Sequence, residues 1–175
     1  MSHDVFGADE QTEYPVALER CVSLARLVVD AEQVPGESEL SVIFVEEQVM
    51  AGLNERFLGG SGPTDVLAFP MDDELVLGGR QPDRGGRGPG SPTEPTDPPT
   101  LLGDVVVCPA VADRQARGAG ATLDDELSLL VVHGVLHLLN YDHAVPEEAE
   151  AMKRRERELL DQFRERGRDG EQATT

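Results

Sequence analysis

Three of the four histidines in this chain, His133, His137 and His143, lie within eleven residues at a spacing that suits metal coordination. On an α-helix, residues four apart stack on one face about one turn apart, so His133 and His137 can hold one ion. A turn after Leu139 can bring His143 back as a third ligand. Three imidazoles leave one position of a tetrahedral metal open for water, which is the arrangement of a catalytic zinc site.

The spacing equals that of the metzincin proteases, H-E-x-x-H-x-x-G-x-x-H, but two positions differ. Gly134 replaces the glutamate that serves those enzymes as general base, and a glycine cannot accept a proton. Asn140 replaces the turn glycine, and asparagine tolerates the left-handed conformation of such a turn. The residues therefore predict a zinc site but not a protease. Zinc is favoured over iron because the predicted ligands are three imidazoles, with Asp142 interpreted as a turn residue or an acceptor that orients a ligand ring.

Apolar periodicity predicts the elements that must position these histidines. Helices are predicted at residues 14–34, 46–58, 109–118, from 122 into the histidines, and at 146–163, and strands at 39–45, 64–69 and 101–108. The helix that follows Thr122 is apolar nearly all round and begins with an N-cap residue and acidic side chains. It is therefore expected to be a buried central helix.

The length of 175 residues predicts one domain. Between residues 78 and 100, twelve of 23 residues are Gly or Pro, which predicts a disordered insertion in a surface loop. Flexible tails are predicted at residues 1–13 and 167–175. Cys21 and Cys108 are expected to be buried, reduced packing residues.

The net charge of −19 argues against a nucleic-acid partner, although seven of the fifteen basic residues lie between Lys153 and Arg168. A contact between RNA and the run that starts at Lys153 remains a hypothesis, because Glu150, Arg154 and Glu158 have the i,i+4 spacing of an ordinary solvated helix face. The sequence shows no signal peptide and no apolar run long enough to span a membrane, which predicts a soluble, cytoplasmic protein.

The segment HGVLHLLNYDH, residues 133–143, resembles the signature HGxLHLxGYDH of the YbeY family of bacterial metal-dependent endoribonucleases. Residues 53–57 and 62–70 resemble the family block LN–R followed by PTDVLSFP, and residues 103–109 resemble its GDI-CP strand. The resemblance covers residues 39–77 and 101–163. Asn140, Ala68 in place of the usual serine, and the long insertion are the differences.

The resemblance implies an α+β fold in which a small mixed β-sheet packs with helices and a zincin-like central helix bears the histidines. It implies a single-strand-specific endoribonuclease acting in 16S rRNA 3′-end maturation and ribosome quality control, with one Zn²⁺ per chain. His133, His137 and His143 would be the metal ligands, and His133 and Arg56 the catalytic residues. The implied partners are the single-stranded 16S rRNA precursor, the small ribosomal subunit and assembly factors, with no membrane.

Two other functions stay open at this stage. A zinc metalloprotease could use the same three ligands, although Gly134 argues against it. A non-catalytic ribosome-assembly factor could use the metal only to stabilise its fold. Without the family block, Arg56 would be interpreted as a solvated arginine on a helix surface, and Thr64 and Asp65 as a turn that caps the next strand. The sequence identifies no general base.

Overall fold

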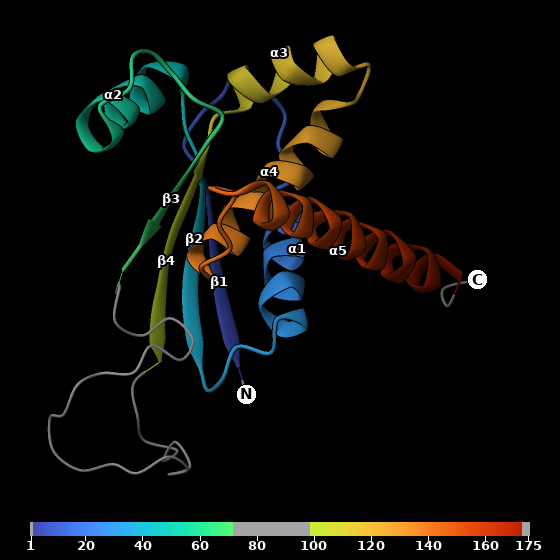
Figure 1. Ribbon diagram of the computed structural model, residues 1–175. Coiled ribbons are helices and arrows are strands. Elements are labelled where there is room, and N and C mark those ends of the chain that lie inside the picture. The colour runs from blue at the N-terminus through green and yellow to red at the C-terminus, as the bar shows by residue number, and fades with distance from the viewer. Residues whose placement is uncertain (1, 72–98, 173–175) are drawn as a thin grey trace, which may run out of the picture.

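The computed structural model describes residues 2–71 and 99–172, and its centre is a four-stranded mixed sheet (Figure 1). The spatial order of the strands is β1 (His3–Asp9), β2 (Ser38–Phe44), β4 (Thr100–Val107) and β3 (Val66–Pro70). The β1, β2 and β4 strands run parallel, and β3 pairs antiparallel with β4 at the edge. The described part of the chain thus has the predicted α+β fold with a small mixed sheet.

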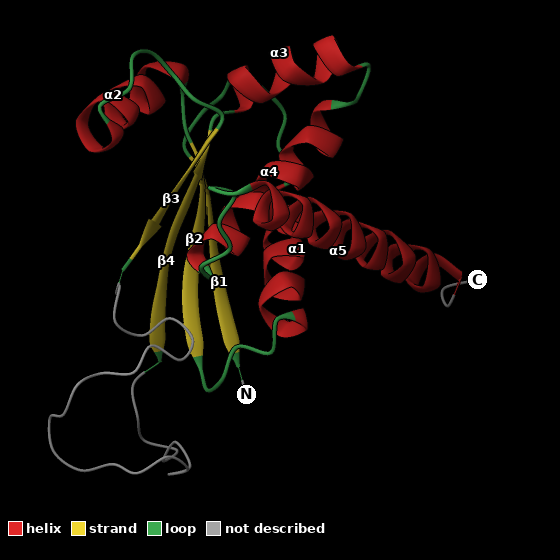
Figure 2. Ribbon diagram, in the orientation of Figure 1, coloured by secondary structure: helices red, strands yellow, loops and turns green. Residues whose placement is uncertain are grey.

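Helices α1 (Leu18–Ala31), α4 (Leu123–Leu138) and α5 (Pro146–Gln172) lie together on one face of this sheet (Figure 2). Helices α2 (Glu47–Leu58) and α3 (Pro109–Ala119) follow β2 and β4 and lie at the end of the sheet where those strands finish. Each predicted helix and strand is present. Their ends differ from the prediction by a few residues, apart from the C-terminal end of α5, which lies farther along the chain.

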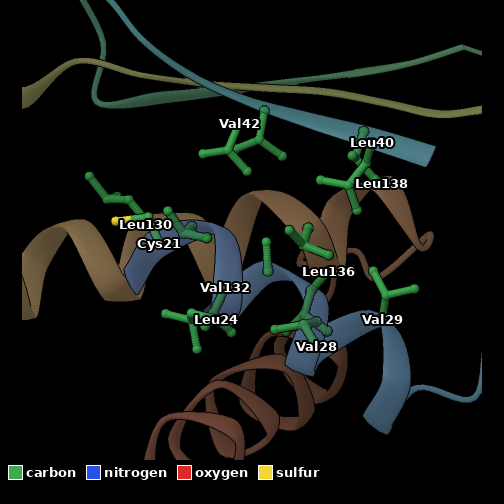
Figure 3. Close-up of a cluster of buried hydrophobic side chains, with 14 of the residues drawn as sticks. Cys21, Leu24, Val28, Val29, Leu40, Val42, Leu130, Val132, Leu136 and Leu138 are labelled. Atoms are coloured by element: carbon green, nitrogen blue, oxygen red, sulfur yellow. The ribbon is translucent and has the colours of Figure 1, made fainter. Parts of the chain in front are cut away.

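The main core fills the space between the sheet and the α1 and α4 helices (Figure 3). The α4 helix begins where Thr122 Oγ1 accepts a hydrogen bond from the Asp125 backbone N–H at 3.1 Å, which satisfies one of the free amides of a helix start. From there its apolar side chains are buried on nearly every side, as its sequence predicts. Cys21 lies in this core, and both it and Cys108 are buried free thiols, as expected.

Glycine is required in β4, where an extra residue interrupts the pairing with β2 between Leu40 and Glu39. Gly103 has φ +134°, and a Cβ placed there would lie 2.1 Å from the Phe69 carbonyl oxygen. Only a residue without a side chain lets the β3 backbone approach β4 this closely. This approach fixes the edge strand that forms one wall of the site described below.

The predicted tails differ from the structure at both ends. Residues 3–9, expected to be flexible, form β1, which pairs with β2 along all seven residues. This strand buries little apolar surface apart from Val5, so its place depends on backbone hydrogen bonds that leave no apolar pattern in the sequence.

At the other end, α5 continues to Gln172, because its Glu- and Arg-rich sequence favours helix without needing a core. The predicted insertion at residues 78–100 lies outside the described residues except at its last two positions, where Thr100 begins β4. None of the helices in the described ranges has the length and hydropathy needed to cross a membrane.

Candidate metal centre

The structure brings the three predicted histidine ligands together at the end of α4. One ring nitrogen from each of His133, His137 and His143 lies within 4.8 Å of the others. The Nε2 atoms of His133 and His137 are 3.0 Å apart, and the ring centroids of the three residues are separated by 4.5 to 6.0 Å. His133 and His137 are half-buried and His143 is exposed, so the cluster faces outward from the core.

The turn that returns His143 to the helix is built around Asn140. Its φ of +66° is left-handed, as the sequence predicts. The Asn140 N–H donates to the His137 carbonyl at 3.1 Å and the Tyr141 N–H donates to the Leu136 carbonyl at 3.0 Å. These two bonds are those of a Schellman motif, which ends a helix and reverses the chain. The backbone N–H of His143 then donates to Asp142 Oδ1 at 2.7 Å, so Asp142 shapes the turn.

Glu156 of α5 holds the ring of His133, and the sequence reasoning missed this residue. The Nδ1–H of His133 donates to Glu156 Oε1 at 2.6 Å, and Glu156 is only 7% exposed. A carboxylate on Nδ1 fixes the tautomer in which Nε2 carries the lone pair that can bind a metal. Glu156 lies 23 residues from His133 on another helix, among many other charged α5 residues, so no local pattern distinguishes it.

The packing around Gly134 shows why the α4 helix has no side chain next to His133. A Cβ built on Gly134 would lie 2.4 Å from Val105 Cγ1 and 3.2 Å from Val66 Cγ2. The α4 helix therefore packs directly onto β4 and β3 at this point. A glutamate, which a metzincin needs here as its base, has no room unless the helix moves away from the sheet.

A cavity of about 640 Å³ opens next to the histidines, between α4, β3 and the end of α2. Its walls include Phe57 and Leu58 of α2, the β3 strand, and Asp65. Asp65 is held in place because its carboxylate accepts hydrogen bonds from the Val66 N–H at 2.7 Å and from Gln115 Nε2 at 3.1 Å. Asp65 thus has the structural role expected of it and also lines the cavity.

The donor set fits zinc. In tetrahedral coordination with Zn–N distances near 2.0 Å, ligand nitrogens are separated by about 3.4 Å, and the separations in this cluster span that value. The pKa of His137 is lowered, first by burial and then by the neighbouring His133 and His143 rings. A lowered pKa keeps the imidazole neutral, which is the form that binds a metal.

Comparisons with known proteins agree with this geometry. The family model described as Endoribonuclease YbeY matches residues 7–164. The chain belongs to this endoribonuclease family. A protein named Endoribonuclease YbeY from Saccharopolyspora erythraea is 50% identical over 143 residues, covering 82% of this chain and 72% of the relative. One of the same name from Thermobifida fusca is 45% identical over 160 residues, covering 91% and 92%.

The solution structure of a protein from Thermotoga maritima is similar to this YbeY-family chain with a TM-score of 0.55 and 27% identity, covering 93% of each chain. The predicted family and its fold are therefore confirmed.

The second predicted catalytic residue, Arg56, lies beside the cavity in this YbeY-family chain. It is exposed on the last turn of α2, with its guanidinium carbon 5.3 Å from the centroid of the Phe57 ring. Phe57 and Leu58, the next two residues, contribute to the cavity wall, whereas Arg56 is not among the lining residues. The structure thus brings the three histidines together, whereas Arg56 lies next to Phe57 and Leu58, which line the same cavity as the histidines.

Arg155, part of the basic run considered for RNA contact, has a structural role in the fold. Its guanidinium donates to Glu32 at 2.6 Å and to Glu158 at 2.9 Å, and Tyr141 also donates to Glu32 at 2.8 Å. These contacts raise the pKa of Arg155 and fasten α5 to the end of α1. They also hold α5 where Glu156, the next residue, reaches His133.

Proposed function

We propose that this protein is a zinc-dependent endoribonuclease that cleaves single-stranded RNA. The observation that carries the proposal is the cluster of His133, His137 and His143 on an open cavity in a chain of the endoribonuclease family. Zinc held there would supply a positive charge that polarises a phosphodiester and lowers the pKa of a coordinated water. The family resemblance further suggests 16S rRNA 3′-end maturation and ribosome quality control as the setting.

The chain's own residues would divide the work of binding and cleavage. The three histidines hold the metal, and Glu156 keeps His133 in its ligating tautomer. Phe57 and Leu58 give the cavity an apolar wall against which a nucleobase can lie. Arg56 lies against Phe57, and its guanidinium would attract a phosphate of a strand that enters the cavity.

The partners that follow from this function are the 16S rRNA precursor, the small ribosomal subunit and its assembly factors, and the setting is the cytoplasm. Gly134 argues against a protease, because the packing against Val105 leaves no space for a general base at that position. A non-catalytic assembly factor would bind zinc in the same place but would leave RNA intact.

The test compares the zinc-loaded protein with its His133→Ala and Arg56→Ala variants on single-stranded RNA and on casein. We expect RNA cleavage to be abolished in His133→Ala, and kcat/KM to fall up to roughly 100-fold in Arg56→Ala, because a guanidinium beside the phosphate stabilises developing charge. Arg117→Ala is a matched control, since Arg117 is an exposed arginine in the last turn of α3, paired with Asp113 at 2.9 Å.

Zinc content and the melting temperature of each variant show whether it retains the metal and the fold. RNA cleavage that persists unchanged in His133→Ala would identify a contaminating nuclease and refute the proposal. Casein cleavage by the parent protein would favour the protease. Stoichiometric zinc with neither activity would favour the assembly factor.

A further inference from the structure

Five arginines converge on a second hollow, between α1 and α5, in a chain whose net charge is −19. The hollow has a volume of about 620 Å³. Its basic side chains are Arg20 and Arg26 from α1 and Arg164, Arg166 and Arg168 from α5. We refer to it as the arginine cleft. Figure 1 shows α5 crossing α1, which brings together residues that are far apart in the sequence.

Several of these arginines are available to a ligand. Within residues 2–71 and 99–168, no carboxylate lies at ion-pair distance from Arg20, Arg166 or Arg168. Arg164 is more engaged, since it lies 3.3 Å from Asp161 and 3.7 Å from Asp125. The like charges of the cleft repel one another, and an anion placed among them would relieve that repulsion.

An aromatic ring forms part of the same cleft. Phe163 lines it, and the guanidinium carbon of Arg20 lies 5.3 Å from the centroid of that ring. Asp30 also lines the cleft, but it faces His3 Nε2 at 3.8 Å. Arginines beside an aromatic ring are common features of grooves that bind single-stranded nucleic acid.

The α5 helix connects the arginine cleft with the metal centre. Glu156, which contacts His133, and Phe163, which lines the cleft, are seven positions apart on this helix, or about 10 Å along its axis. An RNA long enough to engage both places would gain affinity over a short one, because the second contact is intramolecular once the first has formed.

We infer that the arginine cleft is a second RNA-binding site, which holds phosphates of the single strand whose cleavage the metal centre is proposed to catalyse. The inference rests on the proposed function for the choice of RNA as the polyanion. It also revises the idea that the basic run beginning at Lys153 contacts RNA, because the basic side chains that gather in a hollow are those farther along α5 and on α1.

The test measures binding of a fluorescein-labelled 2′-O-methyl oligouridylate of about 20 nucleotides by fluorescence anisotropy over a range of KCl concentrations. The cleft variant is Arg20→Gln/Arg166→Gln/Arg168→Gln. If each arginine neutralises one phosphate, the slope of log K against log salt should fall in magnitude by about 2, and affinity at low salt should fall roughly tenfold or more. The matched control is Lys153→Gln/Arg154→Gln/Arg157→Gln, which removes three exposed charges from α5 outside the cleft.

The control should retain the parent's slope. An unchanged slope in the cleft variant would overturn the inference, and so would an equal loss in the control, which would mean that only net charge matters. If the cleft variant loses binding to polyglutamate but not to RNA, an acidic protein is the ligand and the inference is wrong. The melting temperature should be unchanged in both variants, which excludes loss of the fold as the cause.

The His133→Ala variant separates this inference from the proposed nuclease activity. We expect it to lose RNA cleavage while its binding slope stays that of the parent, since the cleft is intact. If the parent protein binds RNA through the cleft but never cleaves it, the proposed nuclease function fails and the binding site stands. If the parent protein cleaves RNA and the cleft variant binds RNA as the parent does, the inferred binding site is refuted and the nuclease function stands.

Discussion

Replacing Glu156 by glutamine or alanine removes the carboxylate that orients His133, and we expect zinc affinity to fall in both variants. The carboxylate is nearly fully buried, and its Oε1 lies 2.6 Å from His133 Nδ1. Loss of such an outer-shell partner typically weakens metal binding about 10- to 100-fold, which corresponds to about 1.4–2.7 kcal/mol. Glutamine keeps the volume and an acceptor oxygen but loses the charge, so Glu156→Gln should lie near the lower figure and Glu156→Ala near the upper one.

The assay is a competitive titration of zinc against a chromophoric chelator near neutral pH, with the melting temperature of the zinc-free protein measured in parallel. Glu150→Gln is the matched control, because Glu150 is an exposed glutamate on the same helix. Parental zinc affinity in Glu156→Ala would refute the reasoning that this carboxylate holds the ligand ring. A lower zinc-free melting temperature with unchanged zinc affinity would reduce Glu156 to a packing residue.

Three further predictions follow from the backbone and the core. Gly134→Ala should lower the free energy of unfolding, measured by urea denaturation, by about 1–3 kcal/mol, because its Cβ would meet Val105 at 2.4 Å. The control Gly118→Ala, whose Cβ would have nothing within 4 Å, should be neutral or slightly stabilising. Equal effects of the two substitutions would contradict the close packing of the α4 helix on the sheet. Asn140→Ala should cost about 1 kcal/mol by the same measurement, because alanine tolerates φ +66° poorly, and no loss would show that the turn adopts another conformation. Burial raises the pKa of the Cys21 thiol to about 11, so at a pH of about 8 only about 0.1% of it is thiolate. Iodoacetamide should therefore alkylate Cys21 in urea but not in the native protein. Rapid labelling of the native protein would contradict the burial of this side chain.

The histidine cluster could be predicted because its geometry is local. His133 and His137 are one helical turn apart whatever surrounds the helix, and Asn140 signals the reversal that brings His143 back. The α4 cap at Thr122 and the apolar faces of α1 and α4 were likewise predictable, since hydrogen bonds at a helix start and burial of an apolar stripe depend on nearby residues.

The β1 strand and Glu156 could not be predicted, because both depend on partners distant in the sequence. The β1 strand is held by backbone bonds to β2 rather than by an apolar pattern. Glu156 differs from the other glutamates of α5 only in that it packs against His133 of another helix. The position of Arg56 beside the cavity rather than in its lining also depends on how α2 ends, and the motif alone does not contain that information.

The sequence by itself determined the histidine cluster that could hold a metal, and the family, since each follows from residue types at fixed short spacings. The tertiary structure decided three things: that Gly134 has no room for a side chain, that Glu156 is the carboxylate that contacts His133, and that arginines from α1 and α5 share one cleft. The physical reason is that hydrogen bonds, close packing and charge act over a few ångströms in space. Only the folded chain brings segments more than a hundred residues apart, such as those of Arg20 and Arg166, within that range.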